Sequence, residues 1–127
     1  MVRNIFPIPG KWKSHRLLCW VYWFAHASMV NLIGIRHLCW HPRFLIHDLH
    51  KPVMITLGIP YDLVKKIHSQ VPHHQPKTEL DFREAACDWQ SSGYTKPDGL
   101  LDARETLEAY HKEYEAKMLP ILDKYHF

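Results

Sequence analysis

The sequence predicts an all-α protein, and three features of the chain support that fold class. Apolar residues recur at spacings of three and four over long stretches, which is the periodicity of helices that bury one face. No stretch alternates apolar and polar residues as a half-buried strand does, and no segment repeats another. A chain of 127 residues has the length of one compact domain. We therefore expect residues 1–127 to form a single bundle of about five helices.

The N-terminal part is expected to contain an extended arm and two helices. Proline and glycine interrupt residues 1–12, which predicts an arm laid over the body of the domain. A helix is expected over residues 13–33, with Gly34 as its C-terminal break. This helix is apolar nearly all round, so we expect it to be buried nearly all round. Pro42 favours the first turn of a second helix, and Pro52 would stop it.

Three further helices complete the prediction. A short helix is expected over residues 61–69. Thr78 and Asp81 fit a capping box that opens a helix over residues 79–92. Asp102 can cap a last long helix, whose apolar residues again recur every three or four positions. The apolar faces of these last two helices are the expected core: Phe82, Ala85, Ala86, Trp89, Ala103, Leu107, Tyr110, Tyr114, Met118 and Ile121.

Residues 17–35 include no formally charged side chain, and the run is long enough to cross a bilayer. Its first half also resembles a signal peptide, with an A-x-A cleavage motif at residues 25–27. A 16-residue lead precedes the run, however, and Trp20 and Trp23 lie inside it, where membrane helices prefer tryptophan at the ends. The three widely spaced cysteines favour a reducing compartment. We predict a cytoplasmic protein with no membrane contact.

The net charge of +3 is unevenly distributed along the chain. Residues 1–47 contain six basic side chains and no acidic one, whereas residues 48–127 contain 10 basic and 13 acidic side chains. This asymmetry favours an anionic partner, although a solvated basic face is the simpler interpretation. The chain contains no phosphate-binding loop, dinucleotide fingerprint, HExxH helix or GxSxG elbow.

The strongest chemical signal is LIHDLHK at residues 45–51, in a chain with 11 histidines. Burying the adjacent His47 and Asp48 among apolar residues is costly unless a partner satisfies them. Imidazole and carboxylate together suit divalent transition metals such as Mn, Fe, Co, Ni and Zn. Two more ligands are expected on predicted helices beside small or apolar residues, namely His26 and Asp88. His15 and His37 are alternatives to the first of these.

The order His, His-Asp, Asp resembles that of the HD-domain superfamily of metal-dependent phosphohydrolases, which are all-helical. More closely, the segments FAHASMV, LIHDLHKP, PHHQ and ACDWQSSGYTKPDG resemble a small family of short bacterial and phage proteins of unknown function that look like abbreviated HD domains. The resemblance covers roughly residues 20–110. It implies an HD-domain-like bundle that holds one or two divalent transition-metal ions.

The resemblance also implies roles for individual residues. Lys51 matches a lysine that lies near the substrate phosphate or braces the site, although His50 stands where the superfamily often has glycine. Three histidines match the extra ligands of two-metal HD domains and would hold a second metal or contact substrate: His68, His73 and His74. Four residues match the metal-ligand positions: His26, His47, Asp48 and Asp88.

The chemistry expected from this resemblance is hydrolysis of a phosphoester, in a nucleotide or a small phosphorylated metabolite, by a metal-activated water. Asp48 would accept a proton from that water. Lys51, together with Arg43 or Lys96, would offset charge on the phosphoryl oxygens.

Two other functions remain open. One is a non-catalytic binding or adaptor protein that contacts nucleic acid through basic residues near Trp12. The other is a di-iron oxygenase on the same scaffold, with His73 or His74 as a ligand of the second iron. The sequence makes no prediction of oligomeric state.

Overall fold

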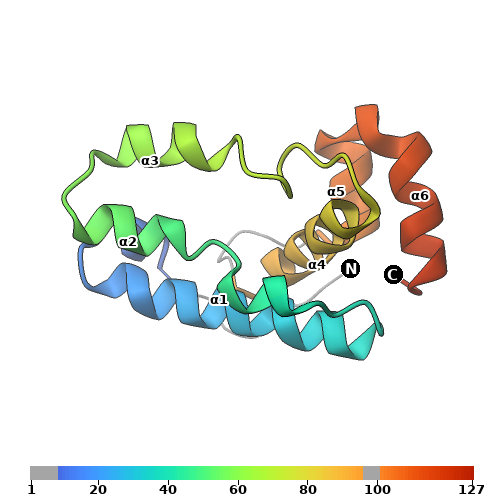
Figure 1. Ribbon diagram of the computed structural model, residues 1–127, viewed down its shortest axis with the longest axis horizontal. Helices are drawn as coiled ribbons and strands as arrows, with labels where there is room; N and C mark the ends of the chain where they lie inside the picture. The colour runs from blue at the N-terminus through green and yellow to red at the C-terminus, as the bar shows by residue number, and fades with distance from the viewer. Residues whose placement is uncertain (1–8, 96–100) are drawn as a thin grey trace.

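The computed structural model describes residues 9–95 and 101–127, and every regular element within them is helical (Figure 1). The all-α prediction is confirmed, with six α-helices in the described ranges in place of about five. In chain order, the elements are η1 (Gly10–Lys13), α1 (Leu18–Arg36), η2 (Pro42–Ile46), α2 (His50–Thr56), α3 (Tyr61–His68), α4 (Glu79–Thr95), α5 (Ala103–Tyr110), η3 (Lys112–Tyr114) and α6 (Glu115–Lys124), where η denotes a 3₁₀ helix.

Helices α1 and α4 pack against each other and form the centre of the molecule. On one side, α2 lies between α1 and α3, as Figure 1 shows. On the other side, α5 and α6 cover α4 and also contact each other. Helix α4 therefore has two buried faces, one toward α1 and one toward the C-terminal helices.

The face of α4 toward α5 and α6 forms an apolar core, as the sequence predicted. Phe82, Ala85, Ala86 and Trp89 are buried there against the C-terminal helices. Their partners are Ala103, Leu107, Met118, Ile121 and Leu122, and Tyr114 packs against the cluster from its edge. The prediction that Tyr110 belongs to the core is wrong, because this residue ends α5 and its side chain is 71% exposed.

The expected helix from Pro42 to Pro52 is divided into two elements. The 3₁₀ helix η2 ends at Ile46, and α2 begins only at His50. Pro52 therefore lies in the first turn of α2, where its missing N–H has no helical acceptor to lose. The prediction that Pro52 stops a helix is wrong, because proline serves equally well in a first turn.

The two predicted N-terminal caps are present. The Thr78 hydroxyl accepts a hydrogen bond from the backbone N–H of Asp81, and the Asp81 carboxylate accepts one from the N–H of Thr78. Asp102 forms the equivalent capping box with Glu105 at the start of α5. The long helix expected after Asp102 is interrupted at His111, where the backbone leaves the helical region before η3 and α6.

The N-terminal segment and α1 differ from expectation in two ways. Within the described part of the predicted 1–12 arm, residues from Gly10 onward form the short helix η1, and residues 1–8 lie outside the described ranges. Helix α1 is not buried all round, because Phe24, Leu32 and Ile35 each expose more than half of their surface.

By length and composition alone, α1 could cross a membrane, and among the described residues it is the one helix that passes this test. The core helix of a soluble protein and a signal sequence near the N-terminus both pass the same test. Since one face of α1 packs against α4, the structure is compatible with a soluble protein.

Candidate metal centre

Two imidazoles and two carboxylates converge between α1, the η2–α2 junction and α4. His26 Nε2 lies 2.7 Å from Asp88 Oδ1 and 3.2 Å from His47 Nε2. His47 Nε2 lies 3.1 Å from the same Asp88 oxygen. Asp48 Oδ2 completes the group, at 3.5 Å from His26 Nε2 and 3.4 Å from His47 Nε2. All four side chains are buried.

These separations match those between neighbouring ligands of one cation. Ligand atoms about 2.1 Å from an ion lie roughly 3.0 Å apart in octahedral and roughly 3.4 Å apart in tetrahedral geometry. The five distances in the cluster run from 2.7 to 3.5 Å. The group formed by His26, His47, Asp48 and Asp88 could therefore hold a divalent metal ion with little rearrangement.

A break in the helix allows adjacent residues to face the same point. In a continuous α-helix, neighbouring side chains diverge by about 100°. Here His47 leaves the helical region (φ −52°, ψ 124°), and Asp48 adopts a left-handed backbone with φ +59°. Asp and Asn tolerate this conformation better than most residues. The Trp23 indole N–H fixes the turn by donating a 2.7 Å hydrogen bond to the His47 carbonyl.

Glu84 is a residue of this cluster that the sequence interpretation missed. Its Oε2 lies 2.8 Å from His47 Nδ1 and 2.9 Å from His73 Nδ1. A carboxylate on the second ring nitrogen orients a metal-binding histidine and leaves its other nitrogen free for the ion. The signal was available, because Glu84 precedes Asp88 by four residues and so shares its face of α4.

Arg43 supports Glu84 from outside the cluster. Its Nε donates to Glu84 Oε1 at 2.6 Å, and its Nη2 donates to Asp81 Oδ1 at 2.8 Å. The sequence predicted that Arg43 contacts phosphate. These two ion pairs favour a different role, in which Arg43 positions the Glu84 carboxylate. Lys96, the other predicted phosphate-binding residue, lies outside the described residues.

A second group of possible ligands shares Asp48 with the first. His73 Nε2 lies 3.0 Å and His68 Nε2 3.6 Å from Asp48 Oδ1, and His74 Nε2 lies 2.8 Å from His68 Nε2. The four residues Asp48, His68, His73 and His74 could also hold a metal ion. The two oxygens of Asp48 thus face different groups, so this carboxylate can bridge two ions.

Asp48 Oδ1 and His73 Nε2, two buried atoms of the second group, lie 3.0 Å apart, and neither has a well-aligned hydrogen bond with any residue that the structure describes. Their contact is an ion pair only while His73 keeps its proton. A cation between these two atoms would satisfy both, so the residues present fit a second ion as well as a first.

The carboxylates set the protonation of the central histidines. Burial alone would lower the pKa of His47, but Asp48, Asp88 and Glu84 raise it to about 10. In the same way, Asp48 and Glu84 outweigh burial and raise the pKa of His73 to about 9. Despite burial, the neighbouring histidines hold the pKa values of Asp48 and Asp88 well below the usual range. Without metal, protons on these histidines therefore balance the carboxylates at neutral pH.

The outer histidines behave differently, because burial dominates there. It lowers the pKa of His68 to about 3 and that of His74 to about 4. Both imidazoles are therefore neutral at pH 7, which is the state that binds a metal.

The two alternatives for the first ligand have other roles. His15 Nδ1 accepts hydrogen bonds from the backbone N–H groups of Leu17 and Leu18, at the start of α1. His37 Nδ1 lies 2.8 Å from the carbonyl oxygen of Tyr125. Among the three candidates, His26 is the one in the cluster, and its Nδ1 lies 3.3 Å from the Ser91 hydroxyl.

A hollow of about 80 Å³ opens over the cluster. It is lined by Lys51 and by ligand candidates from both groups, among them His26, Asp48, His68, His74 and Asp88. A molecule bound in this hollow would contact ions held by either group.

Comparison of the chain with protein-family models, with curated proteins and with solved structures finds no match in any of the three. The interpretation of the cluster therefore depends on its residues and their geometry.

Proposed function

We propose that the protein is a metal-dependent phosphohydrolase of the HD-domain type, acting on a phosphoester of a nucleotide or a small phosphorylated metabolite. One observation carries the proposal: four buried ligand atoms from three separate parts of the chain lie within 4.8 Å of one another, with His–Asp and His–His separations of 2.7–3.5 Å, in the chain order of an HD domain. Lys51 follows the His-Asp doublet by one helical turn and lines the hollow above it, which supports an anionic substrate.

The ligand set favours a transition metal over magnesium or calcium, because nitrogen donors accompany the carboxylates. We expect Mn, Fe, Co, Ni or Zn, with one ion on His26, His47, Asp48 and Asp88. A second ion would be held by Asp48 with His68, His73 and His74. When bound, such a cation supplies Lewis acidity and lowers the pKa of a bound water toward neutrality.

The chain's own residues supply the remaining functions. The Asp48 carboxylate is ionised at neutral pH and borders the hollow, so it is placed to accept the proton of the attacking water. Glu84 holds His47 and His73 in orientation. The Lys51 ammonium offsets the negative charge that develops on the phosphoryl oxygens. The three free cysteines agree with the cytoplasmic location that we propose.

Metal analysis of purified protein tests the proposal most directly. Wild type is expected to retain a transition metal and, with added manganese, to hydrolyse at least one compound in a phosphoester screen. Asparagine at position 48 tolerates the left-handed backbone and keeps the shape of the side chain. Asp48→Asn removes the negative charge from a residue that could bind both ions, so the variant should lose both its metal and its activity. The matched control is Asp62→Asn, on the exposed carboxylate of α3, which should retain both.

A metal-free wild type that resists reconstitution would contradict the proposal and favour the binding or adaptor alternative. Retention of metal by Asp48→Asn would remove Asp48 from the ligand set.

A di-iron oxygenase is the second candidate, and the shared carboxylate of Asp48 between two histidine-containing groups is the observation that favours it. To separate the two functions, the purified protein is loaded with iron in the absence of oxygen, and its oxygen consumption is then measured. Oxygen uptake with no phosphoester hydrolysis would support the oxygenase.

A further inference from the structure

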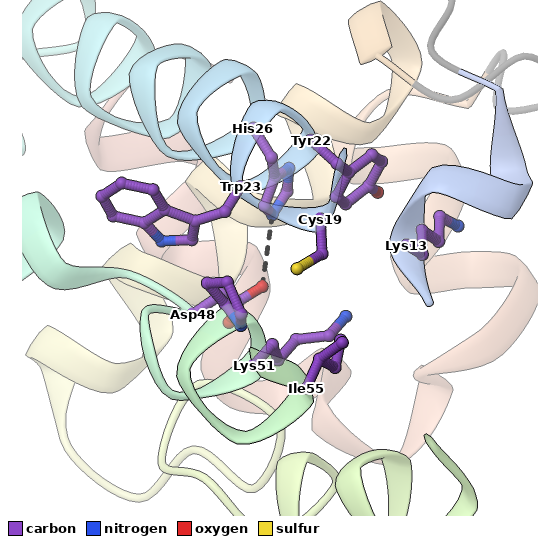
Figure 2. A pocket seen from close by; sticks show the side chains of 9 residues that line it. Lys13, Cys19, Tyr22, Trp23, His26, Asp48, Lys51 and Ile55 are labelled. Carbon is purple, nitrogen blue, oxygen red and sulfur yellow. Dashed lines mark ion pairs between the residues drawn. The ribbon is translucent and has the colours of Figure 1, made fainter. Parts of the chain in front are cut away.

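Helix α1 has two sides of different character. From its inner side, Cys19, Tyr22 and His26 project toward the candidate metal centre, as Figure 2 shows. This side is buried, and it packs against α4. The outer side carries an apolar stripe, whose members recur at the spacing of one helical face and are 49% to 72% exposed: Leu17, Val21, Phe24, Leu32 and Ile35.

This outer stripe differs from the scattered apolar residues that most protein surfaces carry. Large exposed apolar patches on a soluble protein mark sites that contact another protein or a membrane. From α4 onward, Tyr110 is the one large hydrophobic residue that the described chain exposes. The exposed apolar surface is therefore concentrated in the N-terminal half of the molecule, and the outer stripe follows one helix from end to end.

The charges beside the outer stripe are positive. Arg16 lies just before α1 and Arg36 ends it, and both are exposed. Arg16 donates hydrogen bonds to the carbonyl oxygen of Thr56, a neutral acceptor that leaves its charge in place. Residues 1–47 include no acidic side chain. The exposed carboxylates of the described chain lie on α3, at the start of α4, and on α5, η3 and α6.

We propose that the outer stripe of α1 docks on an anionic lipid bilayer, with the helix lying in the plane of the interface. The apolar side chains enter the boundary between headgroups and acyl chains, and Arg16 and Arg36 contact anionic headgroups. The sequence led us to expect no membrane contact, and the exposure of this face is the observation that changes the expectation. The inference goes beyond the proposed function, because it uses none of the candidate metal ligands.

The inner side of α1 determines that the helix lies on the bilayer instead of crossing it. His26 lies there, 3.5 Å from an oxygen of Asp48 and 2.7 Å from an oxygen of Asp88. A spanning helix would have to leave these partners and take an imidazole into hydrocarbon, which is costly. Contact through the outer stripe leaves the packing of α1 against α4 intact.

Charge favours a bilayer over a second copy of the chain as the occupant of this face. A two-fold symmetric contact brings the same patch of both copies together. The basic residues at the ends of the stripe, Arg16 and Arg36, would then face arginines of the other copy. Residues 1–47 contain no carboxylate that could pair with them. Anionic headgroups, in contrast, complement both ends of the stripe.

Co-sedimentation with lipid vesicles tests the docking surface. Wild type is expected to bind vesicles of phosphatidylcholine with phosphatidylglycerol, and to bind pure phosphatidylcholine more weakly. Phe24→Ser removes an apolar side chain that the bilayer covers, so the partition coefficient should fall about tenfold or more. The matched control is Tyr110→Ser, which should bind like wild type. Tyr110 is 71% exposed, close to the 68% of Phe24, but it lies on α5.

Arg36→Gln tests the charge at the end of the stripe. Binding to phosphatidylglycerol vesicles should fall about fivefold, and binding to pure phosphatidylcholine should change little. Higher ionic strength should weaken the binding of wild type for the same reason. The control is Lys117→Gln, which changes an exposed lysine of α6. Circular dichroism verifies that each variant is folded.

Three results would overturn the inference: no binding of folded wild type to phosphatidylglycerol vesicles, equal binding by wild type and Phe24→Ser, or equal losses in Phe24→Ser and Tyr110→Ser. Sedimentation velocity detects the competing occupant. A dimer of wild type that Phe24→Ser dissociates would overturn the bilayer in favour of a second copy. Metal content and phosphoester hydrolysis are measured separately, so failure of the docking surface and failure of the proposed function are distinguishable.

Discussion

Helix α4 separates two buried regions of opposite chemistry. Toward α5 and α6, it buries Phe82, Ala86 and Trp89 against apolar partners. Toward α1, one turn away on the same helix, it buries the carboxylates of Glu84 and Asp88 against histidines. Removing apolar side chains from water is sufficient to stabilise the apolar region. The charged region is balanced only while protons or cations neutralise its carboxylates, so the two regions should respond differently to mutation, pH and metal.

The largest effect is expected from Met118→Ala in the apolar region. Met118 is fully buried beneath α4, so removing its side chain leaves a cavity and should lower the free energy of unfolding by about 2–5 kcal/mol. Urea denaturation measures this loss. Metal content should be unchanged in the folded variant, and loss of metal would show that the two regions are coupled through α4.

Glu84→Gln tests the charged region and should weaken metal binding. The amide keeps the shape of Glu84 but loses the charge that orients His47 and His73, so metal affinity should fall about 10–100-fold, equivalent to about 1.4–2.7 kcal/mol. Competition with a metal-binding dye measures the affinity. The control is Glu108→Gln, which changes an exposed glutamate of α5, and equal effects in both variants would contradict a specific role for Glu84.

The pH dependence should distinguish the regions without any mutation. The pKa of His47 is raised from 6.5 to about 10, so the proton it keeps stabilises metal-free protein fully below pH 6.5 and is lost as the pH rises through the folded pKa. The free energy of unfolding of the metal-free protein should therefore fall as the pH rises through this window. His73, with a pKa of about 9, acts in the same direction.

Urea denaturation between about pH 6 and about pH 9, with and without metal, measures this effect. Metal-loaded protein should lose much less stability, because the cation takes the place of the protons. Stability of the metal-free protein that rises over this range would contradict the assignment.

The smallest effect is expected on the outer face of α1. Phe24 is 68% exposed, so Phe24→Ser should change the free energy of unfolding by about 0.5 kcal/mol or less and leave metal content unchanged. Thermal denaturation at two protein concentrations measures this effect. A large, concentration-dependent loss would show that a second copy of the chain covers this face in solution.

The sequence predicted the ligand candidates better than the helices that carry them. His47, Asp48 and Asp88 stood out because charged or titratable residues are unusual among apolar neighbours, and the structure brings them together with His26. Glu84 did not stand out, since a glutamate in an amphipathic helix usually belongs to a solvated face.

Helix α1 shows why periodicity failed at one point. Its outer face carries Val21, Phe24 and Ile35, while its inner face carries His26 beside two carboxylates. Because apolar residues occupy the exposed side as well as most of the buried one, the pattern does not reveal which face is inside. Long-range packing against α4 decides this, and it is not encoded in the spacing of the helix itself.

The left-handed turn at Asp48 has a consequence for anyone who wishes to transfer this cluster to another protein. Within an unbroken helix, the same dipeptide would direct its imidazole and its carboxylate to different sides. The transferable unit is therefore the interrupted segment from η2 into α2, together with the indole of Trp23 that closes it. A His-Asp dipeptide grafted into an unbroken helix should bind no metal. A graft of the whole interrupted segment would supply two of the four ligands of the first site.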